Sequence, residues 1–344
     1  MNYTGNSNDI TSKEQFNFVR WFKSGKVQKR LVICSFSFLP LLLLIVFTYL
    51  PFYKMIEFSF YNMKYTGPQE WVGLQNYVDV FQRDDCFKAL KLSFYYMAAS
   101  FVQLGIALFF ASILSFKTKG GAFIKGAMFF PYLISGIAVG FIFKFFYARG
   151  FVLDSLLQAV GFHLDQLPYW IQDTSINNGS LAATSVWRYM GQNMVLFIGA
   201  IMSVDQTLYE AADIDGANKL QRFLYVMLPG IKNIVILNMI LSITGSLSAF
   251  EPPYVITKGN MGTGTYFVIM NRIAYENQKV GLASAMAVVL LVIIILCAIA
   301  QKVFFNYLFT DADEKEALRA KKNRKKMLKA KVENTQGGQV RDGN

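Results

Sequence analysis

Residues 205–229 read DQTLYEAADIDGANKLQRFLYVMLP and lie between two long apolar runs, yet they are too polar to cross a bilayer themselves. Thr207 is followed three residues later by Glu210, which matches a capping box. In that motif the hydroxyl and the carboxylate satisfy the free amide groups of a first helical turn. The pattern predicts that a helix begins at Thr207, outside the membrane.

The same stretch contains signals for helix ends. Gly216 is the residue type that most readily adopts the left-handed conformation after a last helical turn. A second short helix is predicted over 219–227, and Pro229 prevents it from continuing unbroken. The sequence therefore predicts a helix-turn-helix that lies against one face of the membrane.

The composition indicates a membrane protein with several spans. The chain has 344 residues, of which 54% are hydrophobic and 16% aromatic, and its mean hydropathy is +0.33. A soluble domain of this length is far less apolar. The three cysteines, Cys34, Cys86 and Cys297, show neither a disulfide pattern nor metal-ligand spacing, so we expect them to serve packing.

Six apolar runs are long enough for a hydrocarbon core that needs about 20 helical residues. They cover 31–53, 92–116, 126–147, 180–203, 233–251 and 281–305. A cytoplasmic N-terminus puts 23 of the 34 Lys and Arg residues on the cytoplasmic side, as the positive-inside rule requires. The predicted fold is an all-α integral membrane protein with both termini in the cytoplasm. The net charge of +12 therefore reports topology, and no nucleic-acid partner is expected.

Three segments are expected along the chain. Residues 1–30 form a cytoplasmic or interfacial N-terminal segment, in which 16–30 is predicted to be a short helix in the membrane interface, the alternative being a flexible basic leader. Residues 31–309 form the transmembrane domain. Residues 310–344 form a charged cytoplasmic tail that is either a helix beside anionic lipid or a solvated segment, and it receives no specific function.

The spacing within 205–229 resembles a known motif. Glu210-Ala211-Ala212, Gly216 and Leu228-Pro229 resemble the cytoplasmic coupling motif of ATP-binding-cassette (ABC) importer permeases, although Val226 stands where isoleucine is usual. The outer stretch WVGLQNY at 71–77 resembles the F-V-G-L-x-N-Y signature of sugar-importer permeases, with tryptophan in place of phenylalanine. Over about residues 30–308 the chain resembles binding-protein-dependent carbohydrate permeases of the maltose, glycerol-phosphate and multiple-sugar type.

This resemblance implies the type I ABC importer permease fold, with six transmembrane helices and a cytoplasmic coupling helix-turn-helix. It implies a bacterial cytoplasmic membrane protein that imports a carbohydrate, and it favours an oligosaccharide as the substrate. The implied partners are a second permease subunit in a heterodimer, two cytoplasmic ATPase subunits, an extracytoplasmic solute-binding protein and membrane lipid. The chain has no G-x-x-x-x-G-K-[ST] phosphate loop. We therefore expect this chain to be a transport subunit and not an enzyme, with no catalytic residue, metal or cofactor of its own. ATP and magnesium are expected on the partner ATPase.

Arg188 is the unusual residue of the apolar runs. A basic side chain deep in a transmembrane helix costs about 2.5–3.5 kcal/mol on insertion scales. Arg188 should therefore face the protein interior or a water-filled cavity; the alternative is that it snorkels to the surface. Aromatic, hydroxyl, amide and guanidinium groups together suit a polyol, and alignment with the maltose-type permease puts several of them at its substrate positions. The predicted substrate path comprises Tyr132, Arg188, Tyr189, Gln192, Ser242, Ser246 and Glu251.

Other transport classes remain open as alternatives. No Asp or Glu lies in the interior of the six runs, because Glu251 is predicted at the outer end of the fifth. Ion-coupled carriers commonly keep an embedded carboxylate, so its absence argues against that class. The alternatives are an ion-independent or ion-coupled secondary carrier, or a polysaccharide-related membrane subunit.

Overall fold

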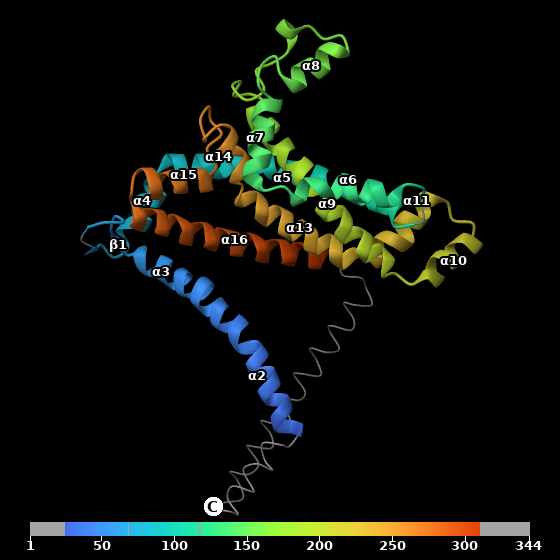
Figure 1. The fold of residues 1–344 in the computed structure, drawn as a ribbon, viewed down its shortest axis with the longest axis horizontal. Helices are drawn as coiled ribbons and strands as arrows, with labels where there is room; N and C mark the ends of the chain where they lie inside the picture. The colour runs from blue at the N-terminus through green and yellow to red at the C-terminus, as the bar shows by residue number, and fades with distance from the viewer. Residues whose placement is uncertain (1–24, 68, 117, 310–344) are drawn as a thin grey trace, which may run out of the picture. The chain divides into compact units, whose positions relative to one another are not determined.

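The computed structural model describes residues 25–67, 69–116 and 118–309, and these residues are predominantly helical (Figure 1). Most of the predicted segment 1–30 and the whole of the tail 310–344 lie outside the described residues. The chain divides into two units. One comprises Met1–Asp79 with Gln278–Val288, and the other comprises Val80–Asn277 with Val289–Asn344.

The first unit begins with one long helical run. It consists of α2 (Gly25–Leu44), the π-helical turn η1 (Ile45–Tyr49) and α3 (Leu50–Phe58). Pro51 follows η1 by two residues. Proline has no amide donor and its ring collides with the carbonyl four residues earlier, so a wider π turn accommodates it without ending the helix.

A short hairpin follows this helix, the one exception to an all-α fold among the described residues. Strand β1 (Tyr61–Asn62) pairs antiparallel with β2 (Glu70–Trp71), and α4 (Gln75–Gln82) follows. The Asn76 side chain donates hydrogen bonds to two backbone carbonyls before and within β1, both at 2.9 Å. A Cβ on Gly281, in the first turn of α16 (Val280–Phe309), would meet the Tyr61 carbonyl at 1.8 Å, so only glycine fits there.

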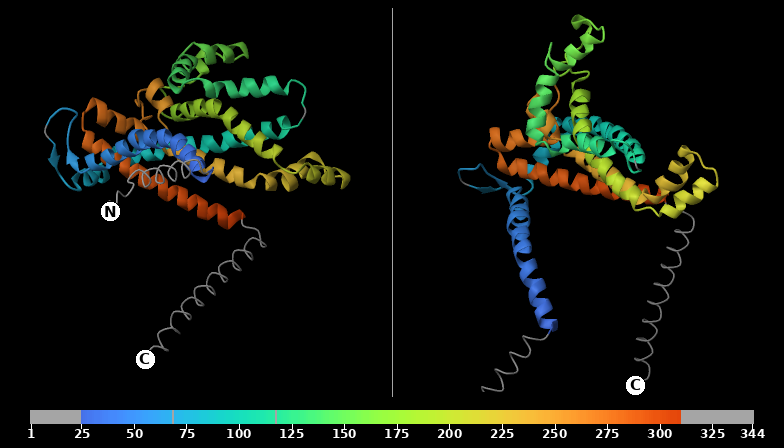
Figure 2. Two further views of the ribbon diagram at one scale, coloured as in Figure 1. Left: turned by 60° about the horizontal axis from the view of Figure 1, so that its bottom comes forward. Right: turned by 45° about the vertical axis from the view of Figure 1, so that its right-hand side comes forward.

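The second unit is built on α5 (Asp84–Leu114), α9 (Asn177–Met202) and α13 (Lys232–Leu247). These helices pack against one another, and α6 (Gly121–Leu133) packs on α9 (Figure 2). Large buried side chains such as Met194, Phe197 and Ile231 form the apolar core between them. A Cβ on Gly191 would meet the Met128 carbonyl at 1.8 Å, so α6 and α9 approach each other backbone to backbone at this glycine.

Shorter elements complete the second unit. They are α7 (Gly136–Phe146), α8 (Val152–Ala159), η2 (Leu164–Gln166), α10 (Gln206–Ile214), α11 (Lys219–Arg222), η3 (Phe223–Met227), α12 (Leu228–Gly230), α14 (Glu251–Ile256), α15 (Tyr266–Asn271) and η4 (Arg272–Glu276).

Six membrane spans are predicted, and the structure supports this count in part. Among the described residues, four helical runs are long and apolar enough to cross a membrane, and a bent helix pair makes a fifth if it counts as one span. The four are Val32–Phe58, Asp84–Leu114, Lys232–Ile256 and Val280–Phe305. Helix α9 covers the predicted run 180–203 and has 26 residues, but it is not among the helices that pass this test.

The predicted third span, 126–147, is wrong as a single helix. The structure has α6 and α7 there, bent by 99°. Ile134 and Ser135 adopt extended conformations between them, and the Ser135 hydroxyl accepts a hydrogen bond from the Ala138 amide at 3.2 Å. A serine N-cap satisfies a free amide at the start of a new helix, which makes a break favourable at this point.

Candidate functional site

The first candidate site is the segment 205–229, which we call the coupling segment. Its first helix, α10, has its N-cap two residues before the predicted Thr207 cap, so that capping box is wrong. Asp205 is the N-cap, and its carboxylate accepts a hydrogen bond from the Thr207 amide at 3.0 Å. This hydrogen bond lowers the pKa of Asp205. Aspartate is among the most favourable N-cap residues, which explains why the helix starts at the earlier position.

The predicted helix end at Gly216 is confirmed. Gly216 has φ +76°, in the left-handed region. The Ala217 amide donates to the Ala212 carbonyl at 2.9 Å, and the Gly216 amide donates to the Asp213 carbonyl at 3.2 Å. These two bonds form a Schellman motif, which turns the chain sharply after α10.

The second helix of the coupling segment extends further than predicted. Asn218 and Gln221 form a capping box at its start, with bonds of 2.8 and 2.9 Å. The helical run then continues through α11, η3 and α12 to Gly230, past Pro229. As at Pro51, a π-helical turn ends two residues before the proline. The wider turn accommodates the proline ring and its missing amide donor without ending the helix.

Arg222 joins the two helices of the coupling segment to the end of α5. Its guanidinium contacts the Asp213 carboxylate of α10 at 2.6 Å. The same guanidinium lies over the rings of Phe116 and Tyr209, at 5.6 and 5.8 Å from their centroids. Tyr209 is buried, which raises the pKa of its phenol. The segment is thus anchored on one side while its other side stays open.

The open side of the coupling segment carries large apolar side chains. Of the predicted coupling residues, Glu210, Ala211, Gly216 and Pro229 are exposed, and Ala212 and Leu228 are half-buried. Around them lie exposed apolar side chains that we call the coupling surface: Leu208, Ile214, Leu220 and Tyr225. An exposed apolar surface beside polar residues is typical of a protein interaction site.

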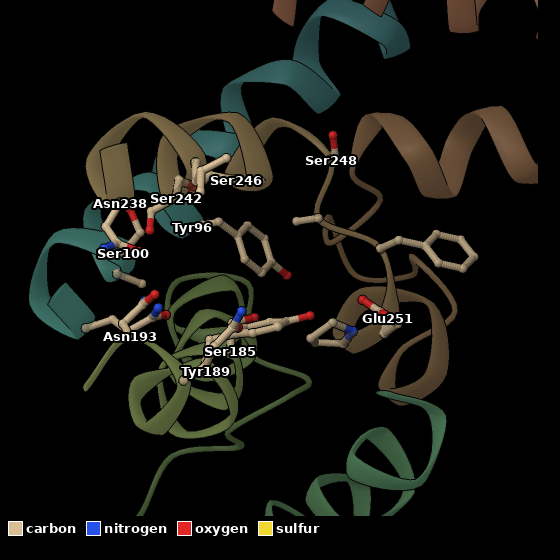
Figure 3. A pocket seen from close by; sticks show the side chains of 18 of the residues that line it. Tyr96, Ser100, Ser185, Tyr189, Asn193, Asn238, Ser242, Ser246, Ser248 and Glu251 are labelled. Carbon is tan, nitrogen blue, oxygen red and sulfur yellow. The ribbon is translucent and has the colours of Figure 1, made fainter. Parts of the chain in front are cut away.

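The second candidate site is a cavity of about 320 Å³ inside the second unit (Figure 3). Helices α5, α9 and α13 and the start of α14 surround it. Its volume lies in the range of small-molecule sites. Five of the predicted substrate-path residues line it, namely Tyr189, Gln192, Ser242, Ser246 and Glu251.

The other two predicted residues lie behind the cavity wall. Arg188 is 14% exposed, and its Nη1 lies 3.4 Å from Glu251 Oε1. The same nitrogen donates a hydrogen bond to the Tyr189 hydroxyl at 3.1 Å. The snorkelling alternative is therefore wrong, because Arg188 points to a carboxylate inside the unit. Tyr132 contacts the Tyr189 ring, with centroids 6.2 Å apart, and supports the wall without lining the cavity.

Glu251 was predicted at the outer end of the fifth span, and this prediction is wrong. It lies within the apolar run Lys232–Ile256, at the break where α13 has ended and α14 begins. A Cβ on Gly136 would lie 2.8 Å from Glu251 Oε1 and 2.5 Å from Arg188 Nη1. Glycine at the first position of α7 therefore makes room for the ion pair.

Sequence reasoning missed the contribution of α5. Tyr96, Ser100 and Gln103 line the cavity from this helix. Their i, i+4, i+7 spacing puts them on one helical face, and this polar stripe in an apolar run was the available signal. Asn193 of α9 and Asn238 of α13 line it as well.

Comparison with known proteins places these sites in a family context. Residues 103–306 match the family model described as "Binding-protein-dependent transport system inner membrane component". The chain is 30% identical over 288 residues to a probable ABC transporter permease protein, YurN, of Bacillus subtilis, covering 81% of this chain and 98% of the relative. It is also 30% identical to the arabinooligosaccharides transport system permease protein AraP of Halalkalibacterium halodurans, covering 85% and 92%.

The fold also has a counterpart among solved structures. A chain of a bacterial alginate ABC transporter, solved in complex with an alginate pentasaccharide-bound periplasmic protein, superposes with a TM-score of 0.70. The match covers 83% of this chain and 96% of that one, at 16% identity. At this identity the likeness concerns the fold.

Proposed function

Because the chain belongs to the family of binding-protein-dependent transport system inner membrane components, we propose that its cavity and its coupling segment serve ATP-driven import of an oligosaccharide. The observation that carries this proposal is the shared use of α5. This helix lines the cavity through Tyr96, and its last residue, Leu114, belongs to the same buried cluster as Tyr209 and Met227 of the coupling segment. A movement of the coupling segment can therefore act on the cavity wall.

The substrate class follows from the cavity lining and from relatives. Hydroxyl and amide side chains alternate with aromatic rings around the cavity, a combination that suits the hydroxyl groups and apolar faces of sugar rings. The name of AraP states that it transports arabinooligosaccharides, and the alginate transporter was solved with an oligosaccharide-bound partner. An oligosaccharide is thus the substrate class that we propose for this chain. A secondary carrier and a polysaccharide-related subunit are not supported by these relatives.

We further propose six spans, with α9 as the one that hydropathy leaves out. Its polar residues, including Arg188 and Asn193, face other helices or the cavity, so they are not exposed to lipid. Six spans with both termini in the cytoplasm put the coupling segment in the cytoplasm too, in a bacterial cell membrane. This arrangement agrees with the distribution of basic residues.

The proposed partners are those of a complete importer. Two cytoplasmic ATPase subunits would hold ATP and magnesium, because the sequence has no phosphate loop of its own, and one of them would bind the coupling surface. A second permease subunit would pair with this chain, and an extracytoplasmic solute-binding protein would deliver the sugar. The periplasmic protein bound to the alginate transporter supports the last of these.

In the proposed mechanism, the chain performs no chemistry. ATP binding closes the ATPase pair, the coupling segment moves with it, and the packed helices of the second unit switch the side to which the cavity opens. The contact between Arg222 of α11 and Asp213 of α10 links the two helices and supports such a concerted movement.

The test is transport by a reconstituted assembly. The chain is copurified from native membranes with its associated subunits and placed in proteoliposomes. We expect sugar-loaded binding protein to stimulate ATP hydrolysis and sugar uptake together. Uptake by this chain alone, without nucleotide, would contradict the proposal and favour a secondary carrier.

A further inference from the structure

Tyr96 has a buried hydroxyl group for which the structure supplies no partner. The residue is 4% exposed, and its phenol oxygen makes no hydrogen bond among the described residues. The ring projects from α5 into the cavity between α9 and α13 (Figure 3). A buried polar group without a partner costs about 1–3 kcal/mol, and a ligand with hydroxyl groups would remove that cost.

The cavity is also electrically balanced. Among the described residues that line it, Glu251 is the only charged one, and its carboxylate is paired with Arg188 behind the wall. The remaining polar lining consists of neutral groups from Ser, Asn, Gln and Tyr side chains. No lysine or arginine within this lining is left to pair with a charge on a ligand.

We propose that the cavity selects an uncharged saccharide and that Tyr96 of α5 is a specificity-determining contact for it. This inference rests on the proposed function, which it narrows. The phenol can donate to one sugar hydroxyl and accept from another. Ser100 and Gln103 extend the same α5 face, so this helix supplies one complete polar wall of the site.

The charge balance explains why an acidic sugar fits poorly. A uronate carboxylate in this cavity would lose its hydration, and burial of an ion without a partner is unfavourable by several kcal/mol. It would also lie in the same small cavity as the Glu251 carboxylate. Arg188 could pair with it only by leaving Glu251 unpaired.

A purely structural role for Tyr96 makes a different prediction. If the phenol only filled space, Tyr96→Phe would remove an unpaired buried oxygen, keep the ring and leave ligand affinity unchanged. The two roles are therefore separated by ligand affinity, and the melting temperature of the same variant shows that it remains folded. Tyr95 provides a matched control, because it is the adjacent tyrosine on α5, is 45% exposed and does not line the cavity.

The experiment measures equilibrium binding to the purified importer assembly in lipid nanodiscs, without nucleotide or binding protein. The probes are arabinotriose and maltotriose, which are neutral, and tri-mannuronate, which is acidic. We expect a neutral probe to bind at least about tenfold more tightly than tri-mannuronate. Tyr96→Phe should weaken the neutral probe about three- to tenfold without lowering the melting temperature, and Tyr95→Phe should leave affinity unchanged.

Two results would overturn the inference. One is binding of tri-mannuronate as tight as or tighter than that of both neutral probes. The other is wild-type affinity in Tyr96→Phe. Either result leaves the proposed function intact if the same preparation still couples ATP hydrolysis to uptake, whereas loss of that coupling in the wild type would count against the proposed function.

Discussion

The ion pair between Arg188 and Glu251 shows how single residues decide the character of the cavity. Each charge is unfavourable inside an apolar run by itself, and each makes the other tolerable. Gly136 contributes by having no side chain, since a Cβ would occupy the space of both groups. Three residues distant in sequence therefore form one neutral unit at the cavity wall, with Glu251 lining the cavity.

Removal of one partner of this pair should be worse than removal of both. Arg188→Met leaves the Glu251 carboxylate unpaired and should destabilise the purified permease by about 1–3 kcal/mol. This loss is smaller than for a fully buried ion pair, because the Glu251 side chain is partly exposed. Arg188→Met combined with Glu251→Gln should recover at least half of the loss. Thermal unfolding of the single and double variants measures this coupling, and strictly additive losses would show that the pair is not coupled.

Two glycines of α9 should respond very differently to the same substitution. Gly191→Ala forces a methyl group into the Met128 carbonyl and should destabilise the protein by about 1–3 kcal/mol, as overpacking does. Gly199→Ala lies on the same helix with nothing within 4 Å and should have little effect or a slight stabilising one. Melting temperatures of both variants are the measurement. Equal melting temperatures would mean that α6 and α9 do not touch at Gly191.

The sequence identified Arg188 and Glu251 as unusual charged residues but did not predict that they form an ion pair. The insertion cost of Arg188 correctly predicted that it faces the interior. Its partner was missed because hydropathy ended the fifth run at Glu251, which hid that residue's position inside the run. Tyr96 was missed because the residue alone does not separate a lipid-facing ring from a ligand-facing one; its spacing with Ser100 and Gln103 on one helical face was the signal that could have identified it.

At the scale of elements, the coupling segment is made from short helices that local contacts join. The Schellman motif at Gly216 sets the turn, the Asn218 capping box starts the next helix, and Arg222 joins the two helices through Asp213. None of these helices is long enough to be stable alone. The segment therefore depends on its caps and on the burial of Tyr209 against the core.

The turn at Gly216 should tolerate side chains according to their left-handed preference. Gly216→Val places a β-branched residue at φ +76° and should uncouple ATP hydrolysis from uptake while membrane insertion persists. Gly216→Asn should keep most of the coupling, because asparagine tolerates this conformation and the surrounding space is open. The ratio of sugar imported to ATP hydrolysed distinguishes them, and equal ratios in the two variants would remove the turn from the coupling role.

Single residues in the sequence predicted where a helix ends better than they predicted a bend between two helices. Gly216 was identified correctly because a positive φ is a property of one residue. The break between α6 and α7 was not predicted, since hydropathy reports the composition of 126–147 but not its path. The signals for a break were present in Pro131 and in Ser135-Gly136, yet proline is tolerated within membrane helices and does not by itself predict a bend.

At the scale of the whole molecule, the open question is which helices cross the membrane. Hydropathy supports four or five spans among the described residues, whereas we propose six. The difference lies in α9, whose polar face lines a cavity. A span that is surrounded by protein does not need the apolarity of one surrounded by lipid, so composition alone undercounts such helices.

Labelling on both sides of α9 tests its crossing directly. Val160, which precedes α9, and Ile214, which follows it, are 77% and 87% exposed. In a background without the three native cysteines, Val160→Cys should react with an impermeant maleimide in right-side-out vesicles. Ile214→Cys should react only after the membrane is permeabilised. Reaction of both from the same side would exclude α9 as a span and reduce the count.

The first helical run has a property that sets it apart from the other spans. In Val32–Phe58, 27 residues long, no residue of the most apolar window is buried. A helix of this length rises about 40 Å at 1.5 Å per residue, about 10 Å more than a typical hydrocarbon core. The ion pair of Lys54 and Glu57 lies in its last turns, so this charged end extends beyond the hydrocarbon core. No side chain of the apolar window packs within its own unit, so lipid or the proposed second permease subunit must cover it, and we expect lipids with longer acyl chains to make this helix stand more upright.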